Sequence, residues 1–187
     1  MCEIAGIINF KKNLFAYEAY NRLLVRDMVC GVLDENSSFS SEWVGEHSAF
    51  SVTLPDNTDR IIKKTVEGYE FIIACYTTTD NLSELKNELV KFGYDFTTNS
   101  DAEILLYTYI HYGEECCKKL NGKYSFCIWD SMRQQIFICR GKPDKHQLFY
   151  AILENTIMFS SCVKSLFRYP EFTPKLDKDG LSEFLTF

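Results

Sequence analysis

Cys2 is the residue best placed to do chemistry in this sequence. It directly follows Met1, and a run of small and β-branched apolar residues follows it over positions 4–8. If Met1 is removed, the free α-amino group of Cys2, with a reference pKa of about 8, can act as base for its own thiol. We therefore predict that Met1 is removed and that Cys2 is an N-terminal nucleophile. The alternative is that Cys2 is an ordinary small buried residue.

A strand must hold such a nucleophile in place, and residues 4–10 have the composition of a buried strand. Further along, apolar residues at helical spacing predict a helix over 14–30, and polar residues predict an exposed loop over 31–45. Strands are expected in the segments 47–54, 64–75, 123–130, 135–140, 148–153 and 156–160. This pattern of hairpins with a few helices favours an α+β fold of two sheets packed face to face.

Two further helices have recognisable starts. Ser83 is a candidate N-cap of a helix over 83–92, and Gly93 stands where a C′ glycine is expected. Ser100 and Glu103 have the spacing of a capping box at the start of a helix that reaches Gly113.

Composition and charge exclude several classes of function. The chain has 187 residues, of which 46% are hydrophobic, and its net charge is −6. Such a chain is globular, and its acidity argues against a nucleic-acid or anionic-membrane partner. No apolar run approaches the ~20 residues of a membrane span, and the N-terminus lacks the features of a signal peptide. We expect a cytoplasmic protein that binds neither nucleic acid nor membranes.

The eight cysteines form no CxxC pair and no Cys/His metal spacing. We therefore expect no metal site, and we expect free thiols in a reducing compartment. No glycine-rich phosphate loop is present either, so no cofactor is assigned to this chain.

Five stretches, taken in order along the chain, resemble a known family. They are residues 1–6 (MCEIAG), 100–103 (SDAE), 122–130 (GKYSFCIWD), 140–150 (RGKPDKHQLFY) and 159–166 (FSSCVKSL). Together they resemble the N-terminal glutaminase domain of asparagine synthetase, a class II glutamine amidotransferase. The resemblance implies the fold of the N-terminal nucleophile hydrolases, a four-layer αββα sandwich of two mainly antiparallel sheets.

The resemblance also assigns roles to residues of the site. It makes Cys2 the nucleophile and Asp101 the group that meets the α-ammonium of glutamine. Ala49 stands where the family has an arginine that binds the substrate carboxylate, an interaction worth roughly 1.5–3 kcal/mol. Tyr76 and Thr77 stand at the Asn-Gly pair that forms the family's oxyanion hole, where the loss of one donor costs about 10²–10³ in rate. A β-branched residue is poorly suited there if the backbone has a positive φ.

Glu3 replaces a glycine beside the nucleophile, and a carboxylate there disfavours the thiolate. We therefore expect a glutamine amidotransferase domain whose glutamine hydrolysis is impaired or lost, and which serves as a scaffold or ammonia-delivery domain. Two alternatives stay open. Cys2 can be an active nucleophile on glutamine, or it can act on another amide in a pocket formed with Tyr76 and the threonines that follow it.

The resemblance also suggests how the chain is organised. Residues 1–170 are expected to form the glutaminase-like domain, and residues 171–187 a linker and the start of a synthetase-like domain. The expected partners are that domain, C-terminal to Phe187 or in another chain, and glutamine. A homodimer is left open.

Overall fold

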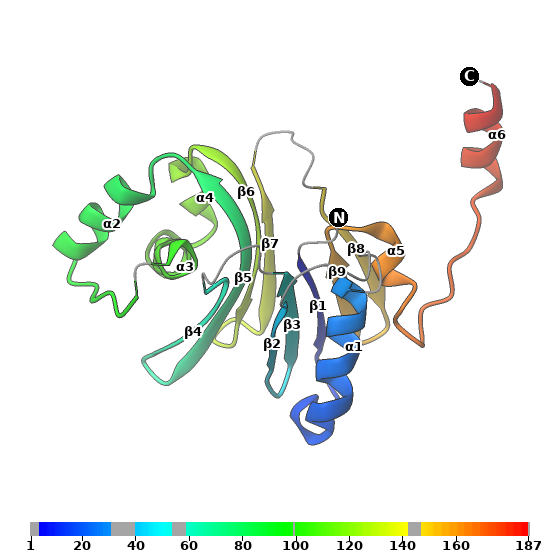
Figure 1. Ribbon diagram of the computed structural model, residues 1–187, viewed down its shortest axis with the longest axis horizontal. Helices are drawn as coiled ribbons and strands as arrows, with labels where there is room; N and C mark the ends of the chain where they lie inside the picture. Colours follow the sequence, from blue (N-terminus) through cyan, green and yellow to red (C-terminus); the bar gives the residue numbers. More distant parts are fainter. Residues whose placement is uncertain (1–3, 31–39, 54–58, 99, 142–146, 187) are drawn as a thin grey trace.

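The computed structural model describes residues 4–30, 40–53, 59–98, 100–141 and 147–186 as an α+β sandwich in four layers (Figure 1). The strands are β1 (Ile4–Asn9), β2 (Ser40–Val44), β3 (Ser48–Thr53), β4 (Ile61–Val66), β5 (Tyr69–Thr79), β6 (Gly122–Asp130), β7 (Gln135–Arg140), β8 (Phe149–Leu153) and β9 (Thr156–Ser160). The helices are η1 (Phe15–Tyr17), α1 (Glu18–Cys30), α2 (Leu82–Lys91), α3 (Asp101–Tyr112), η2 (Gly113–Glu115), α4 (Cys116–Lys119), α5 (Val163–Leu166) and α6 (Lys178–Thr186).

Two antiparallel sheets form the inner layers. Sheet A has the strand order β2-β3-β1-β9-β8, and sheet B has the order β4-β5-β6-β7. Helices α1 and α5 cover the outer face of sheet A, while α2, α3 and α4 cover sheet B; α6 stands apart from the sandwich (Figure 1). The predicted αββα layering is therefore confirmed, with the predicted first strand at the centre of sheet A.

Side chains of β1 alternate between the two faces of sheet A. Ile4 and Ile8 belong to the apolar cluster between the sheets, whereas Ala5 and Ile7 belong to the cluster beneath α1. Every residue of β1 is buried. At Gly6 an added Cβ would lie 2.5 Å from ring carbons of both Phe50 and Phe159, so only glycine fits between these rings.

The short connections follow the expected turn chemistry. Glu67 and Gly68 have positive φ values of 53° and 85° and form the turn of the hairpin between β4 and β5. Gly93, just after α2, has a φ of 90°, as a C′ glycine should.

Two local predictions are wrong. The predicted loop over 31–45 contains strand β2, because Trp43 and Val44 pair with Phe50 and Ala49 of β3; residues 31–39 lie outside the described part of the chain. The N-cap of α2 is Asn81 and not Ser83, and the Asn81 side chain instead bonds the backbone of Lys119 and Asn121. The reason is tertiary, since Asn81 ties α2 to the turn before β6.

At the start of α3, one of the two hydrogen bonds of the predicted capping box is present. The Ser100 side chain accepts a hydrogen bond from the Glu103 N–H, but the Glu103 carboxylate is fully buried and turns elsewhere. It accepts hydrogen bonds from the backbone and side chains of Thr97 and Thr98, and it pairs with Lys64 of β4 at 2.5 Å. The carboxylate thereby ties α3 to the edge of sheet B.

The cysteines differ from the prediction at one place. Cys117 of α4 and Cys139 of β7 are joined in a disulfide, so the prediction that all thiols are free is wrong for this pair. Cys75, Cys116, Cys127 and Cys162 are free. The spacing of 22 residues gives no sign of the pairing, which arises because Cys117 and Cys139 pack in the same apolar cluster. Within the described residues, no helix is long and apolar enough to cross a membrane.

Gly6→Ala should destabilise the protein strongly. The new methyl group would overlap the rings of Phe50 and Phe159, and overpacking of this kind costs about 1–3 kcal/mol or more. Urea unfolding measures the change. Gly180→Ala is the matched control, because its nearest neighbour is the side chain of Asp177, and it should change stability by less than about 1 kcal/mol. Equal stability of the two variants would contradict the tight contact at Gly6.

The buried Glu103 should make stability depend on acid pH. Burial alone would raise the pKa of Glu103, but hydrogen bonds from Lys64, Thr98 and the amides of Thr97 and Thr98 lower it to about 2. The stability that this lowered pKa contributes is present above about pH 4.3, the pKa of glutamate in the unfolded chain, and it is lost as the pH falls toward 2. Between pH 5 and pH 2 the parent should lose on the order of 3 kcal/mol more than Glu103→Gln.

Unfolding followed across this pH range checks the Glu103 prediction. Glu70→Gln is the control, because the ion pair of Glu70 with Lys63 is partly exposed and contributes little. Its pH profile should follow that of the parent. Parallel profiles for Glu103→Gln and the parent would show that the Glu103 network adds no stability.

Candidate active site

The start of β1 is held by a short hydrogen-bond loop to the segment after β9. The Ile4 N–H donates to Ser161 Oγ at 3.1 Å, and the Ser161 N–H donates to the Ile4 carbonyl at 2.9 Å. Ser161 is buried. Cys2 and Glu3, the predicted nucleophile and its acidic neighbour, lie outside the described residues. Ser161 therefore fixes both the N–H and the carbonyl of Ile4, the first residue of β1.

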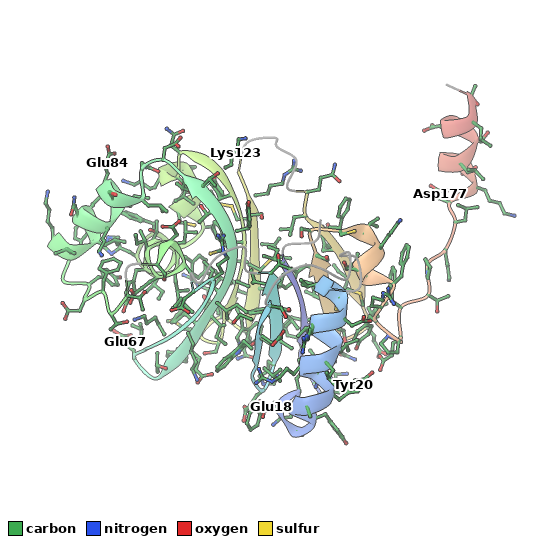
Figure 2. The ribbon with its side chains drawn as sticks, viewed as in Figure 1. Glu18, Tyr20, Glu67, Glu84, Lys123 and Asp177 are labelled. Atoms are coloured by element: carbon green, nitrogen blue, oxygen red, sulfur yellow. A yellow bond between two sulfur atoms is a disulfide. The ribbon has the colours of Figure 1, made fainter. Side chains whose placement is uncertain are left out.

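Ring contacts at the far end of β1 show which end of sheet B lies level with the start of β1. Trp129 of β6 lies 6.0 Å, between ring centres, from both Phe10 and His47, so the Trp129 end of sheet B is level with the far end of β1. The other end of the paired strands β5 and β6, with Tyr76 opposite Ser125, is then level with the start of β1. Figure 2 shows Lys123, near the start of β6, at this end of the sandwich.

Ala49 lies in sheet A and faces away from sheet B. It pairs with Ile7, has no exposed surface, and belongs to the apolar cluster that includes Met28 and Val29 of α1. Its methyl group has no polar function, so position 49 supplies nothing that binds a carboxylate.

Tyr76 lies on the face of β5 that packs between the sheets. Its partner in the ladder is Ser125, which pairs in turn with Arg140 of β7. Ser125 is fully buried, and its hydroxyl has no hydrogen-bond partner in the part of the chain that the structure describes. The guanidinium carbon of Arg60 lies 5.1 Å from the centre of the Tyr76 ring, a cation–π distance.

Thr77 continues the regular strand. In the described residues, Glu67 and Gln134 are the non-glycine residues with positive φ, so Thr77 carries no backbone strain of the kind its β-branched side chain would make costly. Its side chain is buried, and its hydroxyl lies 2.6 Å from that of Thr79.

The N–H of Thr77 points toward an open sheet edge. The Cys75 N–H donates to the Arg60 carbonyl on the β4 side, whereas the Asp80 N–H donates to Asn121 on the β6 side. Backbone N–H groups alternate along a strand, so Thr77 points to the same side as Cys75. On that side the pairing of β4 with β5 ends at Ile61 opposite Ala74. Among the described residues, the Thr77 N–H therefore lies beyond the β4 ladder.

Asp101 is exposed in the first turn of α3. Burial raises the pKa of the Cys75 thiol to about 12, Arg60 lowers it, and Asp101 raises it. Cys75 belongs to the apolar cluster under α3, whereas the Tyr76 ring packs between the sheets. Tyr76 and Thr77 therefore lie near the end of β5, Asp101 begins a helix that covers the outer face of sheet B, and Ala49 lies on the α1 side of sheet A.

Sequence patterns did not identify Arg60 or Ser125. Arg60 precedes β4, and only the register of β4 against β5 shows that it reaches Tyr76. Ser125 is one small residue in an apolar strand, and its burial without a partner depends on tertiary packing. Among the described residues no three His, Cys, Asp or Glu side chains are grouped as metal ligands.

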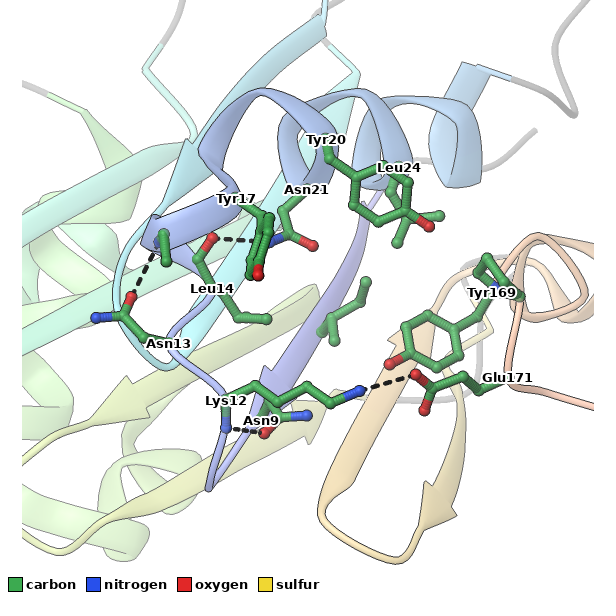
Figure 3. A pocket seen from close by; sticks show the side chains of 13 residues that line it. Asn9, Lys12, Asn13, Leu14, Tyr17, Tyr20, Asn21, Leu24, Tyr169 and Glu171 are labelled. Atoms are coloured by element: carbon green, nitrogen blue, oxygen red, sulfur yellow. Dashed lines mark hydrogen bonds and ion pairs between the residues drawn. The ribbon is translucent and has the colours of Figure 1, made fainter.

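A cavity of about 580 Å³ lies elsewhere, between η1, α1 and the segment 169–171 (Figure 3). Ile7, Leu14 and Leu24 are among its apolar lining residues, and the ion pair of Lys12 with Glu171 crosses its mouth at 2.9 Å. It adjoins Asn9, about 17 Å along β1 from Ile4 at ~3.3 Å per residue. This cavity is separate from the Tyr76 end of the sandwich.

Comparisons with known proteins identify the family. Asparagine synthetase [glutamine-hydrolyzing] 3 of Bacillus subtilis is 28% identical over 194 residues, which cover 98% of this chain and 30% of that protein. Asparagine synthetase [glutamine-hydrolyzing] 1 of the same organism is 29% identical over 192 residues, again 30% of its length. The chain thus spans about a third of the length of these relatives.

A solved structure and a family profile complete the comparison. The glutamine phosphoribosylpyrophosphate amidotransferase of B. subtilis superposes with a TM-score of 0.59 at 14% identity, over 89% of this chain and 43% of that one. This likeness shows the fold and confirms the prediction of an N-terminal nucleophile hydrolase sandwich. The profile of the glutamine amidotransferase domain matches residues 1–187, and the chain therefore belongs to the glutamine amidotransferase domain family.

Proposed function

We propose that this chain is the glutaminase-like domain of an asparagine synthetase-like protein, with impaired or lost hydrolysis of glutamine. In that protein it serves as a scaffold or ammonia-delivery domain. The observation that carries the proposal is the environment of Tyr76. Where the resemblance expects an asparagine amide donor, a tyrosine ring packs between the sheets beneath the Arg60 guanidinium. The buried methyl group of Ala49 adds to this, because it replaces the expected arginine.

The proposed partner is a synthetase-like domain that follows this one. Residues 1–170 would form the glutaminase-like domain, and residues 171–187, including α6, would lead to the partner. Three exposed leucines on this segment, Leu176, Leu181 and Leu185, support the idea that it packs against something else. The lengths of the relatives support the same partner.

We also propose that the protein works in the cytoplasm. Among the described residues four cysteines are free, and three of these are buried, which favours a reducing compartment.

A second candidate function is favoured by the Thr77 backbone. If Cys2 is a free N-terminal nucleophile, the Thr77 N–H is directed where an oxyanion donor is needed, and one of the two donors is then retained. In this alternative Cys2 attacks glutamine or another amide. The two functions differ in whether Cys2 turns over a substrate.

Ammonia release from glutamine separates them. The parent should release ammonia at no more than about 1% of the rate of an intact glutaminase, since one lost oxyanion donor costs about 10²–10³. Cys2→Ala is the blank. Tyr76→Asn/Thr77→Gly, which restores the family's donor pair, should raise the Cys2-dependent rate. Fast Cys2-dependent turnover by the parent would refute the proposal and would place the oxyanion donors elsewhere.

Intact mass should report the state of Cys2 independently of turnover. We predict that Met1 is absent and that a glutamine-like diazoketone adds once, because a thiolate can displace N₂ from the protonated reagent without a complete oxyanion hole. The adduct should be missing in Cys2→Ala but present in Cys162→Ala, which removes another free thiol. A retained Met1 would block the α-amine and rule out the N-terminal nucleophile.

A further inference from the structure

We propose that the cavity between α1 and residues 169–171 binds an uncharged small molecule that contains aromatic rings and carries an N–H or O–H donor, which bonds the side-chain oxygen of Asn21. The cavity adjoins Asn9, at the opposite end of β1 from Ile4. It is a site separate from the Tyr76 end of the sandwich, and the proposal does not depend on hydrolysis of glutamine.

The cavity has the size and the lining of a small-molecule site. Its volume of about 580 Å³ lies within the range of roughly 300–1,000 Å³ that such sites occupy. Ile7, Leu14 and Leu24 form an apolar part of the lining, and each is at least nine-tenths buried. The rings of Tyr17 and Tyr20 also line it and are more than half exposed (Figure 3). A ligand with an apolar, ring-shaped body suits these walls.

Asn21 is the polar group that selects the ligand. The residue is 6% exposed, and its amide nitrogen donates to the Leu14 carbonyl at 2.7 Å. Because a carbonyl can only accept, this bond fixes the orientation of the amide. Its oxygen is turned away from Leu14, toward the side of the cavity where Tyr169 lies (Figure 3). Within the described part of the chain nothing donates to this oxygen, and a buried acceptor without a donor is costly.

Tyr169 provides a second polar group in the wall. The residue is 8% exposed, and its hydroxyl makes no hydrogen bond to another described residue. Its ring lies across the cavity from Asn21 (Figure 3). An aromatic ligand therefore meets a ring face as well as two polar atoms that the fold itself leaves unsatisfied.

The charges around the cavity favour an uncharged ligand. Lys12 and Glu171 are its charged lining residues, and they pair with each other at 2.9 Å. Both side chains are more than half exposed, so the pair lies at the mouth. The two charges offset each other, and the buried part of the lining is neutral.

A small molecule fits this lining better than the surface of a packed domain does. An apolar side chain of such a domain would cover Tyr17 and Tyr20 but would leave the Asn21 oxygen buried without a donor. A ring compound with an N–H group satisfies both parts of the site. Because the lining comes from residues 7–24 and 169–171, the bound molecule would also join α1 to the segment that leads to α6.

Fluorescence titration of the full 187-residue chain with two matched probes tests the proposal. 2-Phenylindole carries an N–H donor, and 1-methyl-2-phenylindole has the same rings without it. The parent should bind 2-phenylindole about 3- to 10-fold more tightly, the effect of one neutral hydrogen bond. Asn21→Ala should reduce this preference to less than about 2-fold. The preference is a ratio measured within one variant, so a general loss of stability does not imitate the effect.

A second pair of variants locates the binding. Ala16 is exposed and lines the cavity, so Ala16→Trp should obstruct it and weaken both probes by about 10-fold or more. Ala19→Trp is the matched control, because Ala19 is exposed on α1 and does not line the cavity; it should bind like the parent.

Three results would overturn the proposal. They are a parent that binds neither probe up to the limit of solubility, a parent that binds both probes equally, and an Ala16→Trp variant that binds like Ala19→Trp. Circular dichroism should show that both tryptophan variants keep the parent's fold. All three results leave the proposed amidotransferase role intact, because ammonia release and labelling of Cys2 test that role separately.

Discussion

The contact of Gly6 with the rings of Phe50 and Phe159 is the constraint on which the rest of the sandwich depends. β1 is the middle strand of sheet A, and its neighbours β3 and β9 each bring one of these rings over it. With no side chain at position 6, the rings can fill the space between the sheets next to Ile4 and Ile8. The spacing of the two sheets is therefore set at the strand that begins just after Cys2.

The two ends of strands near the candidate site are held differently. At the start of β1, Ser161 bonds the N–H and the carbonyl of Ile4. At the end of β5, Tyr76 and Thr77 stand in a regular ladder with β6 but extend beyond the pairing with β4. A fold of this kind can keep its architecture while the groups that meet a ligand change, because those groups lie where the strands end.

Much of the fold was predictable from local sequence. The buried run after Cys2, the Glu67-Gly68 turn and the strand from Gln135 each carry a pattern that short-range physics determines. The exceptions depend on contacts made across the fold. β2 is an edge strand whose polar residues are typical of a loop, and it forms because Trp43 pairs with β3. Asn81 occupies the N-cap position of α2, but its side chain bonds the turn before β6 and not the helix.

The site was predictable only through resemblance, and only in part. Ala49, Tyr76 and Thr77 were identified as departures from a motif, but their facing directions required the sheets. Arg60 carries no motif, and its relation to Tyr76 exists only in the register of β4 against β5. Cys2 and Glu3 remain predictions, since they lie outside the described residues.

The burial of Ala49 bears on the evolutionary history open to this chain. Its methyl group fills a space in the apolar layer under α1 that leaves no surface exposed. An arginine acquired there in a single step would place a charge in that layer, at a cost of several kcal/mol. An arginine at position 49 would therefore fit only if residues on α1 were smaller. Substitutions near the end of β5, beyond its pairing with β4, disturb fewer core contacts and can therefore more easily provide new contacts to a ligand.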